Sequence, residues 1–159
     1  MNMAKIYLGL GSNLGDKKKN ITNATIICHS LMGPIVALSD LFTTEPWGFD
    51  SDNKFMNAVA VLETEQDPQT CLDMACAIER EMGRTRKSVN GEYHDRIIDI
   101  DILLYDDKVV DTPALKIPHP LMHKRDFVMK PLAQVAPELV HPTLGKTMQQ
   151  LLHELTDLN

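Results

Sequence analysis

The 159-residue sequence contains no apolar run near the roughly 18 residues that a membrane-spanning helix needs. Its first residues, MNMAKIYLGLG, lack the charged region, apolar run and small-residue cleavage site of a secretory signal. Positive charge is also scarce. The 16 Lys and Arg stand against 22 Asp and Glu, and the formal net charge of −6 argues against a general nucleic-acid binder. We therefore expect a cytoplasmic protein, a monomer with a dimer as the alternative, that forms one domain over residues 1–159.

The sequence has few cysteines and lacks two familiar phosphate-binding motifs. The three cysteines, Cys28, Cys71 and Cys76, are an odd number without metal-ligand spacing, so we expect reduced, buried thiols. No G-x-x-x-x-G-K-[ST] loop is present, and the kinase signature set is absent. In GLGSNLG the third glycine falls one residue late for a dinucleotide-binding fingerprint, so a tight turn before a helix is the better interpretation.

The stretch DRIIDIDILLYDD, residues 95–107, carries the most informative pattern. Branched apolar residues alternate with Asp99 and Asp101, which predicts a strand with both carboxylates on one face and the isoleucines packed into a core behind them. Adjacent carboxylates repel each other unless a cation lies between them, and oxygen ligands suit Mg²⁺. The pair could hold two ions against phosphate oxygens. The alternative is a solvated face on which the aspartates pair with Arg96.

Strand and helix signals along the chain predict an α+β fold with a ferredoxin-like βαββαβ order. Apolar runs predict three strands before the aspartate strand, at residues 6–10, 35–42 and 55–62. Asp67-Pro68 is a typical helix start, and Thr147 and Gln150 match a capping box. Helices are expected over about 16–32 and 67–83, and from residues 126 and 147 onward. The predicted sandwich has an antiparallel sheet, helices on one face and additional C-terminal helices.

Two polar loops lie beside these elements. Residues 84–95 form a long connection that concentrates cations before the aspartate strand, namely Arg84, Arg86 and Lys87, and arginine matches phosphate oxygens well. Residues 43–53 carry the only tryptophan, Trp47, which either packs down as a local anchor, the more common case, or is offered to a flat ligand. Together with Asn57 and the aspartates, these loops predict phosphoryl or pyrophosphoryl transfer, which needs mainly positioning and charge neutralisation.

Five segments, in order, resemble the 6-hydroxymethyl-7,8-dihydropterin pyrophosphokinases of folate biosynthesis over nearly the whole chain. They are GLGSNLGD, FTTEPWGF with FMNAVAVLET, IEREMGRTRK, RIIDIDILLYDD and IPHPLMHKRDFVMKPLAQVAPELVHP. The resemblance implies a ferredoxin-like α/β sandwich. It implies transfer of pyrophosphate from MgATP to the pterin's hydroxymethyl group, which gives AMP. ATP is then the co-substrate, two Mg²⁺ ions are the cofactors, and the partners are small molecules, with no nucleic acid and no membrane.

The resemblance also assigns roles to individual positions. It implies that Asp99 and Asp101 hold the Mg²⁺ ions and form the catalytic set with Arg84 and Arg96. It implies nucleotide binding by Leu72, Glu79, Arg84, Arg86, Lys87, Arg96, Ile102, His119 and Arg125. It implies pterin binding by Thr44, Glu45, Trp47, Phe55, Asn57, Tyr93 and Phe127. In that arrangement two phenylalanines, Phe55 and Phe127, sandwich the ring, and the Asn57 amide reads its hydrogen-bonding edge.

The chain departs from the family pattern before the aspartate strand. The family commonly has Trp-Gly-Pro-Arg there, whereas this chain has Tyr93-His94-Asp95-Arg96, in which Tyr93 still presents an aromatic face. Two alternatives were weighed. An RNA-binding sheet would carry exposed aromatics and a basic surface, which this acidic chain lacks. A non-catalytic pterin- or nucleotide-binding homologue should have lost an aspartate or a phosphate-facing cation, and none is missing.

Overall fold

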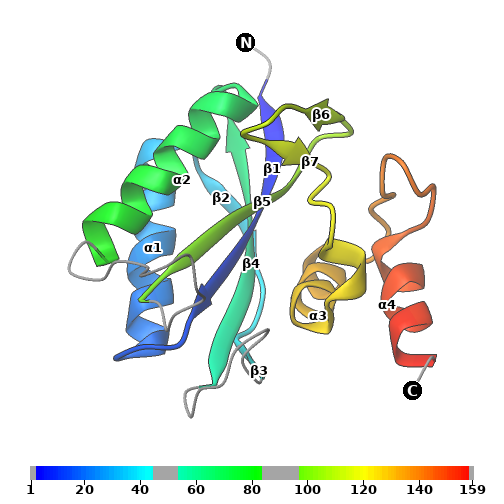
Figure 1. The fold of residues 1–159 in the computed structure, drawn as a ribbon, viewed down its shortest axis with the longest axis horizontal. Helices are drawn as coiled ribbons and strands as arrows, with labels where there is room; N and C mark the ends of the chain where they lie inside the picture. The colour runs from blue at the N-terminus through cyan, green and yellow to red at the C-terminus, as the bar shows by residue number, and fades with distance from the viewer. Residues whose placement is uncertain (1–2, 45–53, 84–96, 158–159) are drawn as a thin grey trace.

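An antiparallel sheet organises the protein, shown in Figure 1 as a computed structural model that describes residues 3–44, 54–83 and 97–157. The spatial order of its main strands is β2-β4-β1-β5, and β3 also pairs with β4. The bounds are β1 (Ala4–Ser12), β2 (Ile35–Leu38), β3 (Phe42–Thr44), β4 (Phe55–Thr64) and β5 (Asp99–Tyr105). Counting β2 and β3 as one interrupted strand gives the ferredoxin-like βαββαβ arrangement, so the predicted fold class is confirmed.

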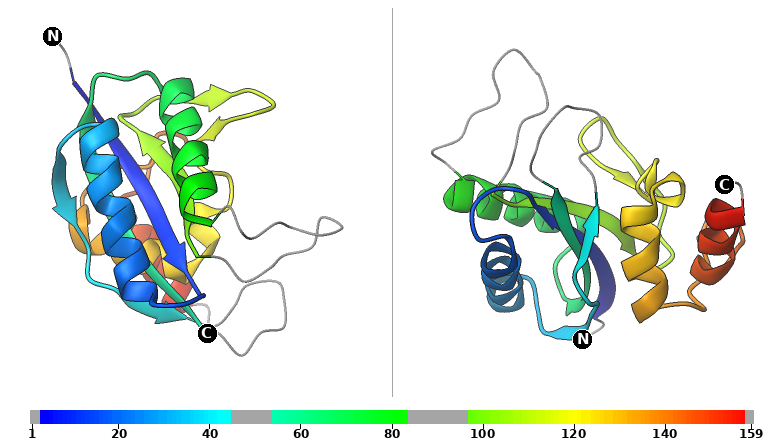
Figure 2. Two further views of the ribbon diagram at one scale, coloured as in Figure 1. Left: turned by 90° about the vertical axis from the view of Figure 1, so that its left-hand side faces the viewer. Right: turned by 90° about the horizontal axis from the view of Figure 1, so that it is seen from below.

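Helices cover both faces of the sheet (Figures 1 and 2). Helices α1 (Lys17–Leu31) and α2 (Pro68–Gly83) pack on one face, where Leu8 of β1 is fully buried. Helix α3 (Asp126–Val135) packs on the other face, near Tyr7 of β1, and α4 (Met148–Asp157) packs against α3. Successive side chains of β1 point to opposite faces of the sheet, so the strand contributes residues to two separate hydrophobic cores. The expected C-terminal helices are present, and they close the face that the βαββαβ unit leaves open.

The predicted strand over residues 35–42 is interrupted. Leu38 pairs with Ala60 and Phe42 pairs with Asn57, so residues 39–41 stand opposite only residues 58 and 59, which makes a β-bulge. The Ser39 hydroxyl accepts a hydrogen bond from the Val59 N–H at 2.8 Å and satisfies the backbone there. The polar pair Ser39-Asp40 interrupts the apolar run at this point, and that signal was passed over when a single strand was predicted.

The predicted helix ends are confirmed by their hydrogen bonds. The Asp16 carboxylate accepts from the Lys19 N–H at 3.1 Å, and the Asp67 carboxylate accepts from the Thr70 N–H at 2.7 Å. At α4 the capping box is complete, because Gln150 N–H donates to the Thr147 hydroxyl and Thr147 N–H donates to the Gln150 side chain. After α1, Gly33 has a φ of +151°, and a Cβ there would lie 1.9 Å from the Glu63 carbonyl oxygen. Only glycine fits that stop.

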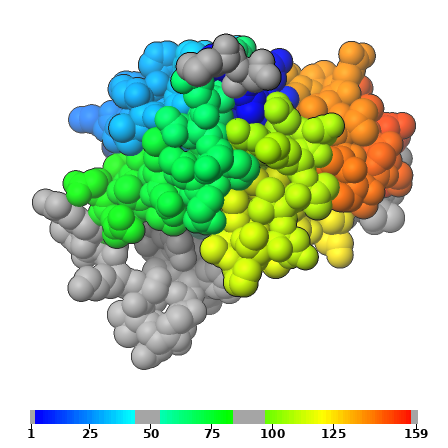
Figure 3. Space-filling view, turned by 90° about the horizontal axis from the view of Figure 1, so that it is seen from above, coloured from blue at the N-terminus to red at the C-terminus, as the bar shows by residue number. Residues whose placement is uncertain are grey.

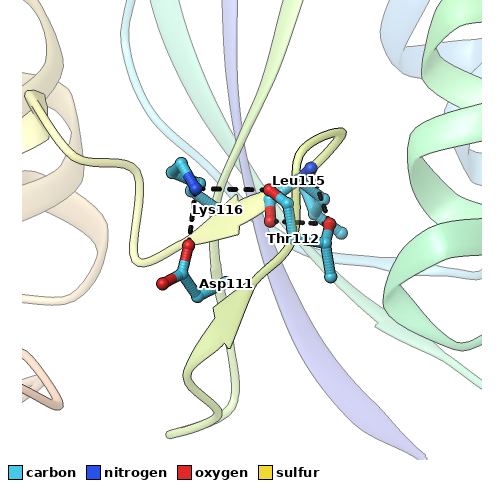
Figure 4. Close-up of polar contacts among 4 residues, drawn as sticks. All are labelled: Asp111, Thr112, Leu115 and Lys116. Atoms are coloured by element: carbon cyan, nitrogen blue, oxygen red, sulfur yellow. Dashed lines mark hydrogen bonds and ion pairs between the residues drawn. The ribbon is translucent and has the colours of Figure 1, made fainter.

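A short hairpin that the sequence analysis did not predict follows β5. Strands β6 (Val110–Asp111) and β7 (Lys116–Ile117) pair with each other, and Thr112 N–H donates to the Leu115 carbonyl at 2.9 Å across the turn. The Lys116 ammonium contacts the Asp111 carboxylate and the Thr112 carbonyl (Figure 4). Figure 3 shows the hairpin beside α2, and Leu115 and Ile117 join the core under that helix. Strands of two residues are too short to leave a periodic signal.

The cysteine prediction is confirmed for two residues and wrong for the third. All three are free thiols, but Cys28 of α1 and Cys71 of α2 are fully buried in the core, whereas Cys76 is only half-buried. Burial raises the pKa of Cys28 to about 11. Within the described ranges, none of the helices has the length and apolar content that crossing a membrane requires.

Candidate active site

The strand register brings the aspartate pair, two glycines and Asn57 onto one face of the sheet. Asp99 pairs with Gly11 and Asp101 pairs with Gly9 across β5 and β1, and Gly11 in turn pairs with Asn57 on β4. Directly opposed residues of antiparallel strands place their side chains on the same face. The row Asn57–Gly11–Asp99 therefore has no side chain in its centre. The predicted pairing of the two carboxylates on one face is confirmed by this register, with Ile98, Ile100 and Ile102 buried behind them.

Gly11 and Asn57 are in close contact at the middle of this row. A Cβ at Gly11 would lie 2.9 Å from Asn57 Oδ1 and 3.5 Å from Cδ1 of Phe55, so glycine allows both side chains to lie over β1. Asn57 is 6% exposed, and its Nδ2 has no hydrogen-bond partner among the residues that the structure describes. A buried amide donor without a partner costs about 1–3 kcal/mol, so its place in a native fold points to a ligand acceptor.

The carboxylates of Asp99 and Asp101 are half-buried at an edge strand, next to a third acid, Glu79 of α2. The Glu79 carboxyl accepts from the Ile100 N–H at 2.8 Å, which covers part of the open edge of β5. Burial, opposed by that hydrogen bond, and then the nearby Asp99 charge raise the pKa of Glu79 to about 8. Glu79 is therefore mostly protonated at neutral pH, which leaves Asp99 and Asp101 as the carboxylates that a cation would bind.

These donors fit Mg²⁺. Carboxylate oxygens are ligands that this hard cation prefers, and it usually keeps only one or two protein carboxylates beside phosphate oxygens and water. Among the described residues, no cluster of three or more His, Cys, Asp or Glu has the arrangement of a protein-only metal site. Asp99 and Asp101 thus suit a site that substrate phosphates complete, rather than a permanent metal centre.

His119 and Arg125 lie on the chain that follows the hairpin, on the side of Asp99. The pKa of His119 is lowered by burial and by the Arg125 charge, and the Asp99 charge opposes this shift. His119 Nδ1 accepts from the Leu121 N–H at 3.3 Å, so the neutral ring carries its proton on Nε2. Arg125 stands over the ring of Phe127, with Cζ 5.6 Å from the ring centroid. A donor ring and a guanidinium beside the carboxylates suit phosphate oxygens.

The remaining predicted site residues fall into three groups. Thr44 pairs with Phe55 at the end of β3 and β4, and Leu72 lies half-buried on α2. Ile102 is buried in the core under the helices, so its side chain cannot contact a nucleotide. Ile102 lies two residues after Ile100, whose N–H points away from β1 toward Glu79. The backbone of Ile102 therefore also points to the open edge of the sheet, where it can contact a nucleotide. Seven predicted residues lie outside the described ranges: Glu45, Trp47, Arg84, Arg86, Lys87, Tyr93 and Arg96.

Gly9 and Gly11 are site residues that the sequence analysis missed. The prediction places Gly9 in a strand that ends at residue 10 and Gly11 in the turn that follows, whereas β1 continues to Ser12 and contains both. The available signal was their spacing of two, which matches that of Asp99 and Asp101. In a pair of antiparallel strands such spacing sets two bare positions beside two carboxylates.

The fold and this site together define the class, an α+β enzyme of phosphoryl or pyrophosphoryl transfer. The chain belongs to the 7,8-dihydro-6-hydroxymethylpterin-pyrophosphokinase (HPPK) family, whose model matches residues 7–137. The site residues named above that the structure describes, from Gly9 to Phe127, all lie inside the matched range.

Two curated relatives carry the name 2-amino-4-hydroxy-6-hydroxymethyldihydropteridine pyrophosphokinase. The protein of Porphyromonas gingivalis strain W83 is 51% identical over 141 residues, which are 88% of this chain and 95% of the relative. That of Aquifex aeolicus is 38% identical over 154 residues, 97% of this chain and 94% of the relative. The folic acid synthesis protein fol1 of Schizosaccharomyces pombe is 38% identical over 150 residues, but this chain spans only 20% of its length.

Solved structures agree on the fold. The crystal structure of wild-type Plasmodium falciparum HPPK-DHPS with pteroate superposes with a TM-score of 0.79 at 17% identity. The match covers 98% of this chain and 43% of the Plasmodium chain, so the present protein corresponds to under half of that structure. At such low identity the likeness establishes the fold alone.

Proposed function

We propose that this protein transfers pyrophosphate from MgATP to the hydroxymethyl group of 6-hydroxymethyl-7,8-dihydropterin, giving AMP and the pterin diphosphate, in folate biosynthesis. Family membership supports the activity. The observation that carries the assignment of residues is the row Asn57–Gly11–Asp99, because it sets a buried, unpartnered amide beside a carboxylate pair with no side chain between them. A flat ligand over Gly11 would have its hydrogen-bonding edge at Asn57 and its reacting end toward Asp99.

Asp99 and Asp101 would hold Mg²⁺, in our proposal two ions, against the ATP phosphates. When bound, the metal would neutralise phosphate charge and lower the pKa of the attacking hydroxyl. The neighbouring Glu79 would support the edge of β5 through its bond to the Ile100 N–H. In this proposal the two carboxylates of β5 bind the metal, and Glu79 of α2 stabilises the edge of β5.

Several hydrogen-bond donors, most of them cationic, would bind the triphosphate. His119 and Arg125 approach from the segment after the hairpin, and the charge of Arg125 already acts on the His119 ring. We expect further contacts from Arg84, Arg86, Lys87 and Arg96. These donors would hold the β-phosphorus for in-line attack by the pterin hydroxyl and spread the charge that develops on its oxygens. The backbone of Ile102 and the side chain of Leu72 would face the base of the nucleotide.

The pterin ring would lie between Phe55 and Phe127, with Asn57 reading its polar edge. Phe55 is half-buried on β4 beside Gly11, and Phe127 is half-buried at the start of α3. We assign Thr44, Glu45, Trp47 and Tyr93 to the binding of the same pterin. A paired aromatic face gives affinity, whereas the buried amide rejects rings that lack the matching donors and acceptors. We also propose a cytoplasmic protein that acts as a monomer, with a dimer as the alternative.

The test is AMP formation from ATP and Mg²⁺, with and without the pterin, in wild type, Asp101→Asn and Asp107→Asn. Asp107 is the matched control, because it is an exposed aspartate on the turn after β5. We expect pterin-dependent AMP in wild type and control, and a loss of more than about 100-fold in Asp101→Asn. ADP in place of AMP would overturn the transfer of pyrophosphate. Tight pterin binding without turnover would identify a non-catalytic homologue instead.

A further inference from the structure

His141 is a buried histidine in the segment between α3 and α4. It is 4% exposed, and its Nδ1 accepts hydrogen bonds from the N–H groups of Thr143 and Leu144 at 3.3 and 3.2 Å. The neutral ring therefore carries its proton on Nε2. Two backbone donors fix both the tautomer and the orientation of this ring, which gives it a defined face to present to its neighbours.

The ring of His141 meets the ring of His123 edge to face. Their centroids are 6.1 Å apart and their planes cross at 73°. His123 belongs to η1 (Met122–Lys124), a 3₁₀ turn that packs against both α3 and α4. Nδ1 of His123 is buried and has no hydrogen-bond partner in the part of the chain that is described, and the edge-to-face contact with His141 packs this ring.

The turn η1 leads directly into Arg125. The Arg125 N–H donates to the Met122 carbonyl at 3.3 Å, which closes the turn, and the Arg125 carbonyl accepts from the Met129 N–H at 3.0 Å, which opens α3. The backbone of Arg125 is thus fixed between the end of one element and the start of the next. A shift of η1 would move the guanidinium, because the arginine has no independent loop to absorb the change.

We propose that His141 is a positioning residue, which supports η1 through the ring of His123 and so holds Arg125 in place for the nucleotide phosphates. The inference rests on the proposed role of Arg125 in ATP binding. The loop before α4 makes none of the proposed ligand contacts. The proposal nevertheless makes one of its residues, His141, a determinant of ATP affinity. The ring of His141 carries the effect, whereas its Nδ1 serves the local loop.

Two substitutions at position 141 separate these two duties. His141→Asn keeps an acceptor near Nδ1 for the Thr143 and Leu144 donors but removes the ring that contacts His123. His141→Phe keeps a ring but loses the acceptor. We expect His141→Asn to melt close to wild type and to bind a non-hydrolysable ATP analogue with Mg²⁺ about tenfold more weakly, the loss of roughly one charge-assisted contact. We expect His141→Phe to melt lower and to keep wild-type affinity.

A thermodynamic cycle then tests whether the effect passes through Arg125. Binding of the same analogue is measured calorimetrically in wild type, His141→Asn, Arg125→Lys and the double variant, with His153→Asn on the exposed face of α4 as control. Lysine keeps a charge, so affinity stays measurable while the planar fork is lost. We expect His141→Asn to have little effect in the Arg125→Lys background. Equal weakening in both backgrounds, or wild-type affinity of His141→Asn, would overturn the inference.

Failure of the proposed function has a different signature. Wild-type affinity in Arg125→Ala, which removes the cation altogether, would remove Arg125 from the phosphate site, whatever His141 does. Absence of pterin-dependent AMP from the wild-type protein would overturn the activity even if the cycle showed full coupling. If His141→Asn does not fold, His123→Ala replaces it in the cycle, because that change removes the same ring contact from the other side.

Discussion

Gly11 and Asn57 lie opposite each other on β1 and β4, and a Cβ on Gly11 would come within 2.9 Å of Asn57 Oδ1. Contacts that short force one partner to move. The neighbouring Phe55 ring, at 3.5 Å from the same Cβ position, leaves the amide little room on that side. The absence of a side chain at Gly11 is therefore what sets the position of the amide on which pterin recognition depends in our proposal.

We predict that Gly11→Ala weakens pterin binding by about tenfold or more, because the new methyl group displaces the Asn57 amide. The matched comparison is Gly9→Ala, since the nearest atoms to a Cβ at Gly9 would be Leu103 side-chain carbons at 3.5 Å, an ordinary contact. Calorimetric titration of each variant with the pterin measures the difference. Equal affinities in the two variants would show that Gly11 does not set the amide.

Asn57→Ala separates stability from recognition. Asn57 Nδ2 is buried without a partner among the described residues, so its removal relieves an unsatisfied donor and should change the free energy of unfolding by less than about 1 kcal/mol. Pterin affinity should fall by about 100-fold, because the ligand loses its polar partner. Chemical denaturation and pterin titration of the same preparation measure both. A large loss of stability with unchanged affinity would mean that the amide serves the fold.

Much of this arrangement follows from sequence patterns, and the rest depends on register. The alternation of isoleucines with Asp99 and Asp101 predicts both the strand and its carboxylate face, because one side of β5 is packed in the core and the other is polar. The same alternation cannot say which residues of β1 stand opposite, so the role of Gly11 was missed. The polar pair Ser39-Asp40 marks the break in the second predicted strand, but the form of the break depends on the bond from the Val59 N–H to the Ser39 hydroxyl, which local sequence does not show.

Glu79 offers a test of how the edge of β5 is held. Its carboxyl accepts from the Ile100 N–H at 2.8 Å. We predict that Glu79→Ala lowers the free energy of unfolding by about 1–3 kcal/mol, because the strand loses its acceptor in a partly buried place. Glu79→Gln keeps an acceptor and is expected to stay within about 1 kcal/mol of wild type. Urea denaturation of the metal-free protein compares them. Equal losses in both variants would mean that charge, rather than this hydrogen bond, is what the strand requires.

Thiol reactivity should follow burial. Burial raises the pKa values of all three cysteines, most strongly that of Cys28, to about 11, and only Cys76 is half-exposed. Since the thiolate is the reactive form, we expect iodoacetamide at pH 8 to modify Cys76 first and to leave Cys28 and Cys71 unmodified until the protein unfolds. Peptide mass spectrometry over time, with Cys76→Ser as the control, measures the order. Early labelling of Cys28 would show that α1 opens from the sheet.

His141 predicts how stability depends on pH. Burial, and secondarily the His123 charge, lower its pKa below the ordinary value of 6.5. In the folded state the ring therefore stays neutral at a pH where the unfolded chain already binds a proton, and stability falls as the pH drops below 6.5. The loss is complete once the pH passes the lowered folded pKa, because both states are then protonated. His119 also has a lowered pKa and contributes in the same direction.

We expect the free energy of unfolding, measured in urea between pH 8 and pH 5, to fall less steeply in His141→Asn, which has no proton to gain there. His153→Asn, at an exposed position on α4, serves as the control. A wild-type slope in His141→Asn would mean that the ring is already protonated in the folded protein, against the two N–H donors that point at it.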